Sequence, residues 1–152
     1  SDVCSSDLLQ AVLALGVDRV GIADTVGYAD PRQVREVFTA VLAEVGTVPV
    51  AAHFHDTRGL ALANAYATLS LGIQRFDASL AGIGGCPHAP GASGNVSTED
   101  LAYMLRSMGI TTGLDINALL GLRQQVATWL EGETLHGTLW QAGLPKTMTE
   151  TA

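Results

Sequence analysis

The sequence predicts an α/β fold with parallel strands, as found in the C-terminal half of a (β/α)8 barrel. Strand-like and helix-like segments alternate with connections of only a few residues, which is typical of parallel strands joined by crossover helices. Three full strands and a short fourth one are expected, whereas a complete barrel needs about 250 residues. An open doubly wound sheet has the same alternation, but no Gly-x-Gly-x-x-Gly motif follows the first strand, which weakens a dinucleotide-binding interpretation.

The composition narrows the class of partner. Of the 152 residues, 47% are hydrophobic, which is ample for a buried core. A formal charge of −7 and a pI near 4.8 argue against nucleic acid and anionic membrane surfaces. The apolar runs are all shorter than the roughly 18 residues that a membrane span requires. We therefore expect a protein that acts on a small molecule and has no nucleic-acid or membrane partner. The cytoplasm is its default compartment.

The ends of the sequence are expected to differ from its centre. Residues 1–8, SDVCSSDL, match the translation of a common sequencing adaptor codon by codon, so they are expected to be an artefact. We expect a partial barrel domain over residues 9–135 and an irregular tail over 136–152. Residues 9–15 have the pattern of a helix end closed by Gly16.

The next two elements have clear local signals. Residues 17–24 are rich in β-branched side chains and bounded by turn residues, which predicts a strand. Within residues 28–46 we expect a helix, with Asp30 as N-cap, Pro31 at the first helical position and Gln33 completing a capping box. Its apolar residues recur at helical spacing: Val34, Val37, Phe38, Val41, Leu42 and Val45.

The remaining elements continue the alternation. Strands are expected at 48–56 and 73–84, and helices at 58–72, 98–109 and 115–133. The loop 85–95 is rich in Gly and Pro, and a short extended piece about Asn95 and Val96 leads into the helix at 98–109. Glu99 and Asp100 are expected only to favour the dipole of that helix.

Polar side chains follow each of the predicted strands. Asp24, His53, His55, Cys86 and Asn95 all lie at or just after a strand's C-terminal end, which is the edge where parallel α/β folds place their active sites. His53 and His55 point to the same side because strand side chains alternate with period two. Two imidazoles on one face indicate a divalent-metal site, and a histidine hydrogen-bonded within the barrel wall is the structural alternative.

Each of the other three candidates has a functional and a structural interpretation. Cys86, in a glycine-rich loop, could act as nucleophile, acid or metal ligand, or could be an incidental surface cysteine. Asn95 offers a carbonyl oxygen that suits a hard cation, or is a turn residue beside Gly94. Asp24 could be a general base or hydrogen-bond anchor, or an ordinary cap or turn aspartate.

Three stretches together resemble the 3-hydroxy-3-methylglutaryl-CoA (HMG-CoA) lyases, from a superfamily of metal-dependent lyases and Claisen-type synthases. They are ADTVGYADP, HFHDTRGLALAN and DASLAGIGGCPHAPGASGNVSTEDLAYMLRSMGI, and the likeness runs over about residues 21–120. The resemblance implies that His53, His55 and Asn95 bind Mg²⁺ or Mn²⁺. It also implies that Cys86 is catalytic and that Asp24 is an active-site residue.

The implied reaction splits an acyl-CoA substrate, HMG-CoA, into acetyl-CoA and acetoacetate. A metal that chelates the substrate's hydroxyl and carboxylate oxygens favours loss of the hydroxyl proton. His53 or Asp24 is the expected base for that proton. Cys86 would then protonate the acetyl-CoA enolate while its loop excludes water. The sequence is compatible with a homo-oligomer of the full-length protein.

Two alternatives stay open. Synthases of the isopropylmalate and homocitrate type share the superfamily, but they read His-x-His-Asn-Asp and have a shorter loop without cysteine. This chain has Asp56-Thr57 and a cysteine-containing loop, so the lyase is favoured. The other alternative is a non-catalytic fragment, because the family's arginine and aspartate at the end of the first barrel strand would lie upstream of Leu9. We therefore expect the 152-residue chain by itself to be inactive and poorly soluble.

Overall fold

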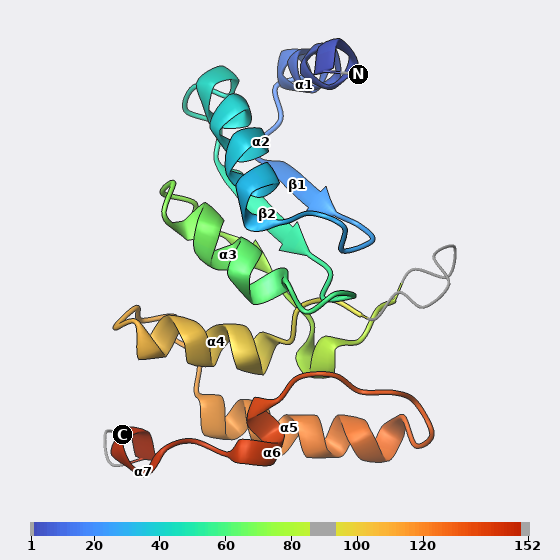
Figure 1. Cartoon of the computed structure of the whole chain (residues 1–152), viewed down its shortest axis with the longest axis vertical. Helices are drawn as coiled ribbons and strands as arrows, with labels where there is room; N and C mark the ends of the chain where they lie inside the picture. The colour runs from blue at the N-terminus through green and yellow to red at the C-terminus, as the bar shows by residue number, and fades with distance from the viewer. Residues whose placement is uncertain (1, 86–93, 150–152) are drawn as a thin grey trace. The chain divides into compact units, whose positions relative to one another are not determined.

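The structure is a computed structural model that describes residues 2–85 and 94–149 (Figure 1). It consists of two compact units, which divide after Asp77. In the described ranges, no helix is long and apolar enough to cross a membrane.

The first unit is a small parallel sheet with helices between its strands. Its elements are α1 (Asp2–Ala14), β1 (Val20–Asp24), α2 (Pro31–Glu44), β2 (Val50–Phe54), α3 (Ala61–Leu69) and β3 (Phe76–Asp77). The strands lie in the order β1-β2-β3, and both pairings are parallel. The predicted parallel α/β arrangement is therefore confirmed.

The register of the sheet decides which side chains share a face. Ala23 pairs with His53, and Asp24 pairs with Phe54. Since paired residues of neighbouring strands point to the same side, Asp24 and Phe54 lie on one face and His53 lies on the other. The ring of Phe38, from α2, is 6.1 Å from that of Phe54. Helix α2 therefore covers the Phe54 face, and the His53 face is the one turned away from α2.

The start of α2 is as predicted. Asp30 Oδ1 accepts the N–H groups of Arg32 and Gln33 at 2.8 and 2.9 Å, and Gln33 Oε1 accepts the Asp30 N–H at 3.2 Å. This reciprocal pair is the capping box, with Pro31 at the first helical position. Helix α3 begins later than expected, at Ala61, because the Asp56 carboxylate accepts the Ala61 N–H at 2.9 Å.

The second unit is mainly helical. It contains η1 (Leu80–Gly82), α4 (Thr98–Ser107), α5 (Ile116–Trp129), α6 (Leu139–Ala142) and α7 (Lys146–Thr149). The expected short extended piece before α4 is present as a parallel bridge between Ser79 and Ser97. The predicted strand at 73–84 is largely wrong, because β3 has only two residues and the chain then turns. Ala81 and Gly82 have φ values of 57° and 64°, which end any extended conformation.

The C-terminal segment is more ordered than an irregular tail. Between His136 and Thr149 it forms α6 and α7, and Leu139 is buried in a cluster with Ala102 and Ile116. Asp100 fixes the start of α6, because its Oδ1 accepts the Leu139 N–H at 2.9 Å and its Oδ2 accepts the Thr138 N–H at 2.8 Å. The carboxylate of Asp100 and the buried side chain of Leu139 therefore hold this polar segment in place.

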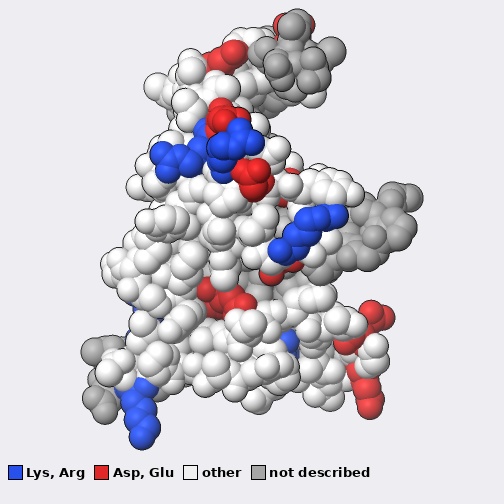
Figure 2. Space-filling model, viewed as in Figure 1, with Lys and Arg blue, Asp and Glu red and all other residues white. Residues whose placement is uncertain are grey.

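The charged side chains are mixed in sign. On the face drawn in Figure 2, basic and acidic side chains lie together in the upper part, whereas those near the bottom stand apart from one another. One such pair is Arg32 and Glu36 on α2, at 2.9 Å and largely exposed.

Candidate functional site

The two histidines of the first unit lie together. His53 is the last residue but one of β2, on the face turned away from α2, and His55 directly follows the end of the strand. Their ring centroids are 5.3 Å apart and the rings are inclined by 55°. His53 is half-buried, while His55 is only 7% exposed. The sequence prediction that both imidazoles share one face is confirmed.

The carboxylate of Asp24 accepts hydrogen bonds from the backbone that follows β1. Its Oδ1 accepts the Tyr28 N–H at 3.0 Å, and its Oδ2 accepts the Ala29 N–H at 2.9 Å. The side chain also lines an apolar hollow with Phe38 and Phe54, on the face of the sheet opposite His53. The carboxylate therefore organises the loop between β1 and α2, which is the turn-aspartate interpretation.

The same loop is attached to the segment that carries His55. Gly27 has a φ of +65°, and a Cβ at this position would lie 2.9 Å from the His55 carbonyl oxygen. Arg58 Nη1 donates to the Gly27 carbonyl at 3.1 Å, and its guanidinium lies 4.0 Å from the centre of the Tyr28 ring. A glycine is required here by close packing, and Arg58 holds the loop from the outside.

Asp77 is a candidate that the sequence interpretation missed. It pairs with His53 across β2 and β3, so its exposed side chain lies on the histidine face of the sheet. The signal was available: an aspartate ends a strand at the edge where the other candidates were sought. It was overlooked because the predicted strand ran on to residue 84.

Asn95, in the second unit, is held in one orientation. Its Nδ2 donates to Ser79 Oγ at 3.0 Å and to the Ile83 carbonyl at 2.8 Å. A carbonyl can only accept, so the Ile83 contact identifies which end of the carboxamide is nitrogen. Asn95 is 8% exposed, and among the described residues its buried Oδ1 has no hydrogen-bond partner. A buried acceptor left open in this way fits a cation ligand.

Asn95 is preceded by a very close contact between two backbone segments. A Cβ on Gly94 would lie 1.4 Å from the Gly82 carbonyl oxygen, so only glycine fits. A Cβ on Gly82 would lie 3.0 Å from the Asn95 carbonyl oxygen. The backbone on both sides of the glycine-rich loop is therefore packed tightly against itself.

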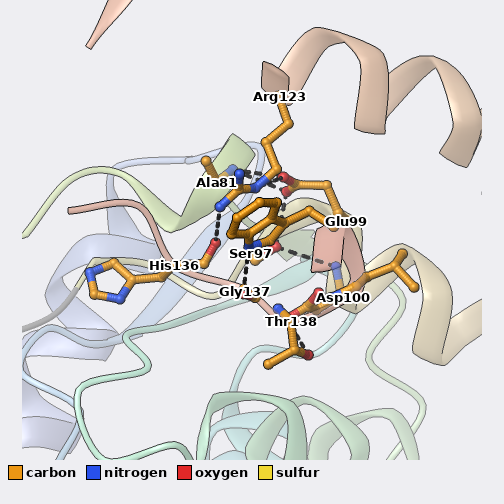
Figure 3. Close-up of polar contacts among 10 residues, drawn as sticks. Ala81, Ser97, Glu99, Asp100, Arg123, His136, Gly137 and Thr138 are labelled. Carbon is orange, nitrogen blue, oxygen red and sulfur yellow. Dashed lines mark hydrogen bonds and ion pairs between the residues drawn. The ribbon is translucent and has the colours of Figure 1, made fainter. Parts of the chain in front are cut away.

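A buried ion pair lies next to this region. Glu99 and Arg123 approach to 3.3 Å with side chains that are 1% and 4% exposed. Figure 3 shows Glu99 pointing toward Ala81, Ser97 and Arg123, which come from different segments of the second unit. The sequence interpretation gave Glu99 only a role toward the helix dipole, because its partner is 24 positions away in the chain.

Taken residue by residue, the predicted ligands offer atoms that suit a hard or borderline divalent cation. Two imidazoles and one carboxamide oxygen are nitrogen and oxygen donors of the kind that Mg²⁺ and Mn²⁺ accept. Considering only His, Cys, Asp and Glu, the described residues hold no group of three that could bind a metal ion. Cys86, the remaining candidate, lies outside the described residues.

Comparisons with known proteins agree with these features. The profile of the HMGL-like family matches residues 4–126. The chain is 46% identical over 124 residues to the hydroxymethylglutaryl-CoA lyase YngG of Bacillus subtilis, covering 82% of this chain and 40% of the relative. It is also 46% identical over 116 residues to a 3-hydroxy-3-isohexenylglutaryl-CoA/hydroxymethylglutaryl-CoA lyase of Pseudomonas aeruginosa, covering 76% of this chain and 39% of the relative. The chain thus spans about 40% of the length of these relatives.

Solved structures give the same result. An HMG-CoA lyase from Acinetobacter baumannii, solved with coenzyme A and 3-methylmalate, matches with a TM-score of 0.89 and 41% identity over 96% of this chain and 48% of that one. The lyase from Bacillus subtilis matches with a TM-score of 0.83 and 42% identity over 90% and 45% of the two chains. The prediction of part of a lyase barrel is confirmed. The chain belongs to the HMGL-like family.

Proposed function

We propose that the protein to which this chain belongs cleaves HMG-CoA into acetyl-CoA and acetoacetate with the help of a divalent metal. The single observation that carries the proposal is Asn95, whose carboxamide nitrogen is held by two acceptors while its buried Oδ1 is left open. The likeness to named lyases over most of the chain supports the same reaction.

The metal would be held by His55 and Asn95, and also by His53 if His53 is not the base. Bound Mg²⁺ or Mn²⁺ would hold the substrate's hydroxyl and carboxylate oxygens and stabilise the charge that develops as the carbon–carbon bond breaks. His55 is buried and so limited in its movement. The amide hydrogen bonds to Ser79 and Ile83 would keep the Asn95 oxygen directed at the ion, as partners of metal ligands commonly do.

Two residues, His53 and Asp24, are candidates for the base that takes the hydroxyl proton. His53 lies on the same face as His55, whereas both oxygens of Asp24 already accept backbone N–H groups on the opposite face. We therefore favour His53 for proton transfer and assign Asp24 to positioning of the loop that packs against His55. A neutral imidazole has only one nitrogen with a free lone pair, which either binds a metal or accepts a proton, so the two roles of His53 are alternatives.

Replacing His53 by alanine distinguishes those roles. Loss of Mn²⁺ binding would assign His53 as a ligand, while retained Mn²⁺ binding with a strongly reduced kcat would assign it as the base. His136 lies in the second unit, where its backbone N–H bonds to the Ala81 carbonyl, and it provides a histidine-to-alanine control that should change neither quantity greatly.

Cys86 would supply the final proton. Breaking the bond leaves acetoacetate and the enolate of acetyl-CoA, and the enolate carbon takes the thiol proton to give acetyl-CoA. Replacing Cys86 by alanine should strongly reduce acetoacetate release while leaving Mn²⁺ affinity unchanged.

The test uses the protein expressed from its complete gene, incubated with HMG-CoA and Mg²⁺ or with EDTA. We expect acetoacetate and acetyl-CoA in equal amounts, lost with EDTA. Condensation of acetyl-CoA with an oxo acid, in place of cleavage, would overturn the lyase assignment in favour of a synthase. The 152-residue chain assayed in parallel should be inactive, and activity there would refute our fragment interpretation.

A related substrate is tested in the same assay. One relative that is 46% identical over 116 residues is named for both 3-hydroxy-3-isohexenylglutaryl-CoA and HMG-CoA. Comparing kcat/KM for the two acyl chains would show which of them the protein prefers. Cleavage of the longer chain alone would retain the reaction type and correct the substrate.

A further inference from the structure

The ion pair between Glu99 and Arg123 is unusual in being almost wholly buried. The two side chains are 1% and 4% exposed, and Arg123 Nε lies 3.3 Å from Glu99 Oε1. A buried ion pair gives little net stability compared with apolar side chains of the same volume, since both charges lose their hydration. Stability alone therefore does not explain why this ion pair is buried here. The other hydrogen bonds of Glu99 and Arg123 indicate a further role.

Glu99 holds a strained point of the backbone. Its two carboxylate oxygens accept the Ala81 N–H at 3.1 and 3.0 Å, and Oε2 also accepts the Ser97 hydroxyl at 2.9 Å. Ala81 has a φ of 57°, in the left-handed region that costs a residue with a side chain about 1 kcal/mol or more. The carboxylate offsets that cost and fixes the turn η1.

Ala81 is also held from its other side. Its carbonyl accepts the His136 N–H at 2.8 Å, and the His136 carbonyl accepts a hydrogen bond from Arg123 Nη2 at 3.0 Å. The Arg123 guanidinium lies 4.3 Å from the centre of the Trp140 ring. Both polar groups of the Ala81 backbone therefore lead back to the ion pair, and Figure 3 shows Arg123 between Glu99 and the His136 carbonyl.

The turn that these contacts fix orients Asn95. Ala81 lies midway between Ser79 and Ile83, and these two residues supply the oxygens that accept the Asn95 amide hydrogens. Movement of Ala81 would displace both acceptors. The Asn95 carboxamide could then rotate, and its Oδ1 would lose its fixed direction.

We propose that Glu99, supported by Arg123, is a positioning residue for Asn95 as a metal ligand. The contacts run from Arg123 to Glu99 and from Glu99 to Ala81. The turn at Ala81 then fixes Ser79 and Ile83, which hold the Asn95 carboxamide. The inference rests on the proposed metal role of Asn95. It means that Glu99 and Arg123, buried in the second unit, affect metal affinity without binding the metal.

The test compares Mn²⁺ affinity, measured by electron paramagnetic resonance titration, in variants of the protein from its complete gene. Glu99→Gln removes the charge and places an amide where the carboxylate accepts hydrogen bonds, so we expect the Kd for Mn²⁺ to rise by about tenfold. Asp100→Asn is the matched control on the next residue of α4, because Asp100 bonds to Thr138 and Leu139. Its Kd should stay within about twofold of wild type by the same reasoning.

A double variant separates positioning from stability. Glu99→Leu with Arg123→Met replaces the ion pair by apolar side chains of similar size, which should recover most of the Tm lost in Glu99→Gln. It provides no acceptor for the Ala81 N–H, so the Kd should remain raised. It also keeps the proposal testable if Glu99→Gln does not fold.

The outcomes are distinct. An unchanged Kd in Glu99→Gln, or a Kd that returns to wild type whenever the Tm does, would overturn the positioning role while leaving the metal site in place. A wild-type protein that binds no Mn²⁺ would instead overturn the proposed metal function itself. A raised Kd in both Glu99 variants together with a normal Kd in Asp100→Asn would support the proposal.

Discussion

Replacing Gly94 by alanine should weaken metal binding, although residue 94 offers no side chain to a metal. The new Cβ would lie 1.4 Å from the Gly82 carbonyl oxygen and 2.6 Å from its carbon. Ordinary van der Waals contact begins at 3.4 Å, so one of the two backbone segments must retreat by about 2 Å. Both atoms are backbone, so no flexible side chain can move away instead.

That retreat breaks the contacts that orient Asn95. Its amide bonds of 3.0 Å to Ser79 Oγ and 2.8 Å to the Ile83 carbonyl would lengthen beyond hydrogen-bonding distance. Each of the two broken hydrogen bonds leaves a buried polar group unpaired at a cost of about 1–3 kcal/mol, so the free energy of unfolding should fall by about 2–6 kcal/mol. The Kd for Mn²⁺ should rise by about tenfold or more, as when a partner of a metal ligand is lost.

The assay combines urea unfolding with Mn²⁺ titration of the protein from its complete gene. Gly121→Ala is the matched control, because Gly121 lies within α5 and a Cβ there would meet nothing within 4 Å. It should stabilise the protein by up to about 1 kcal/mol through helix propensity and leave the Kd unchanged. If Gly94→Ala behaved like Gly121→Ala in both measurements, the close packing that we describe around Asn95 would be refuted.

Three further changes test other parts of the account. Phe38→Ala should lower the free energy of unfolding by about 3–5 kcal/mol in urea because Phe38 is 1% exposed, whereas Val37→Ala, at a position 50% exposed, should cost much less. Asp30→Ala removes the capping box of α2 and should cost about 1 kcal/mol in the same measurement; no loss would contradict the cap. Asp24→Asn should lower the Tm, because it weakens the hydrogen bonds that order the β1–α2 loop, and should leave Mn²⁺ affinity within about twofold of wild type. If His53 is a ligand, His53→Ala should lower that affinity at least tenfold. Equal losses of affinity in the two variants would contradict the different faces of the sheet that we assign to Asp24 and His53.

Local signals in the sequence were sufficient for several features of the structure. The capping box at Asp30 and Gln33 depends on residues three positions apart, so the spacing alone predicted it. The shared face of His53 and His55 follows from the period of a strand, which holds in any parallel sheet. The alternation of strands and helices predicted the parallel pairing correctly.

Features that depend on contacts between distant residues were not predictable in this way. The face on which Asp24 lies is set by its register against Phe54, and a one-residue change would have placed it beside His53. The turn after β3 depends on the Glu99 carboxylate, which lies 18 positions beyond Ala81. Glu99 itself has the sequence pattern of a first-turn acid, and only its burial against Arg123 reveals another role.

The aromatic residues near the C-terminus show the same limit. Trp129 and Trp140 carry large apolar side chains of a type that is highly buried on average, but they are 70% and 46% exposed. Trp140 instead lies against the Arg123 guanidinium, and its Nε1 donates to the Gly137 carbonyl at 3.1 Å. Hydrophobicity predicts burial on average, but an indole can also cover a charged group near the surface.

The most direct test of the central claim is a Mn²⁺ anomalous difference map from crystals of the protein expressed from its complete gene. Our account predicts one strong peak bonded to an imidazole nitrogen of His55 and to Asn95 Oδ1, with His53 as a further ligand or immediately beside it. A peak elsewhere in the protein, or one that leaves Asn95 Oδ1 uncoordinated, would contradict the account.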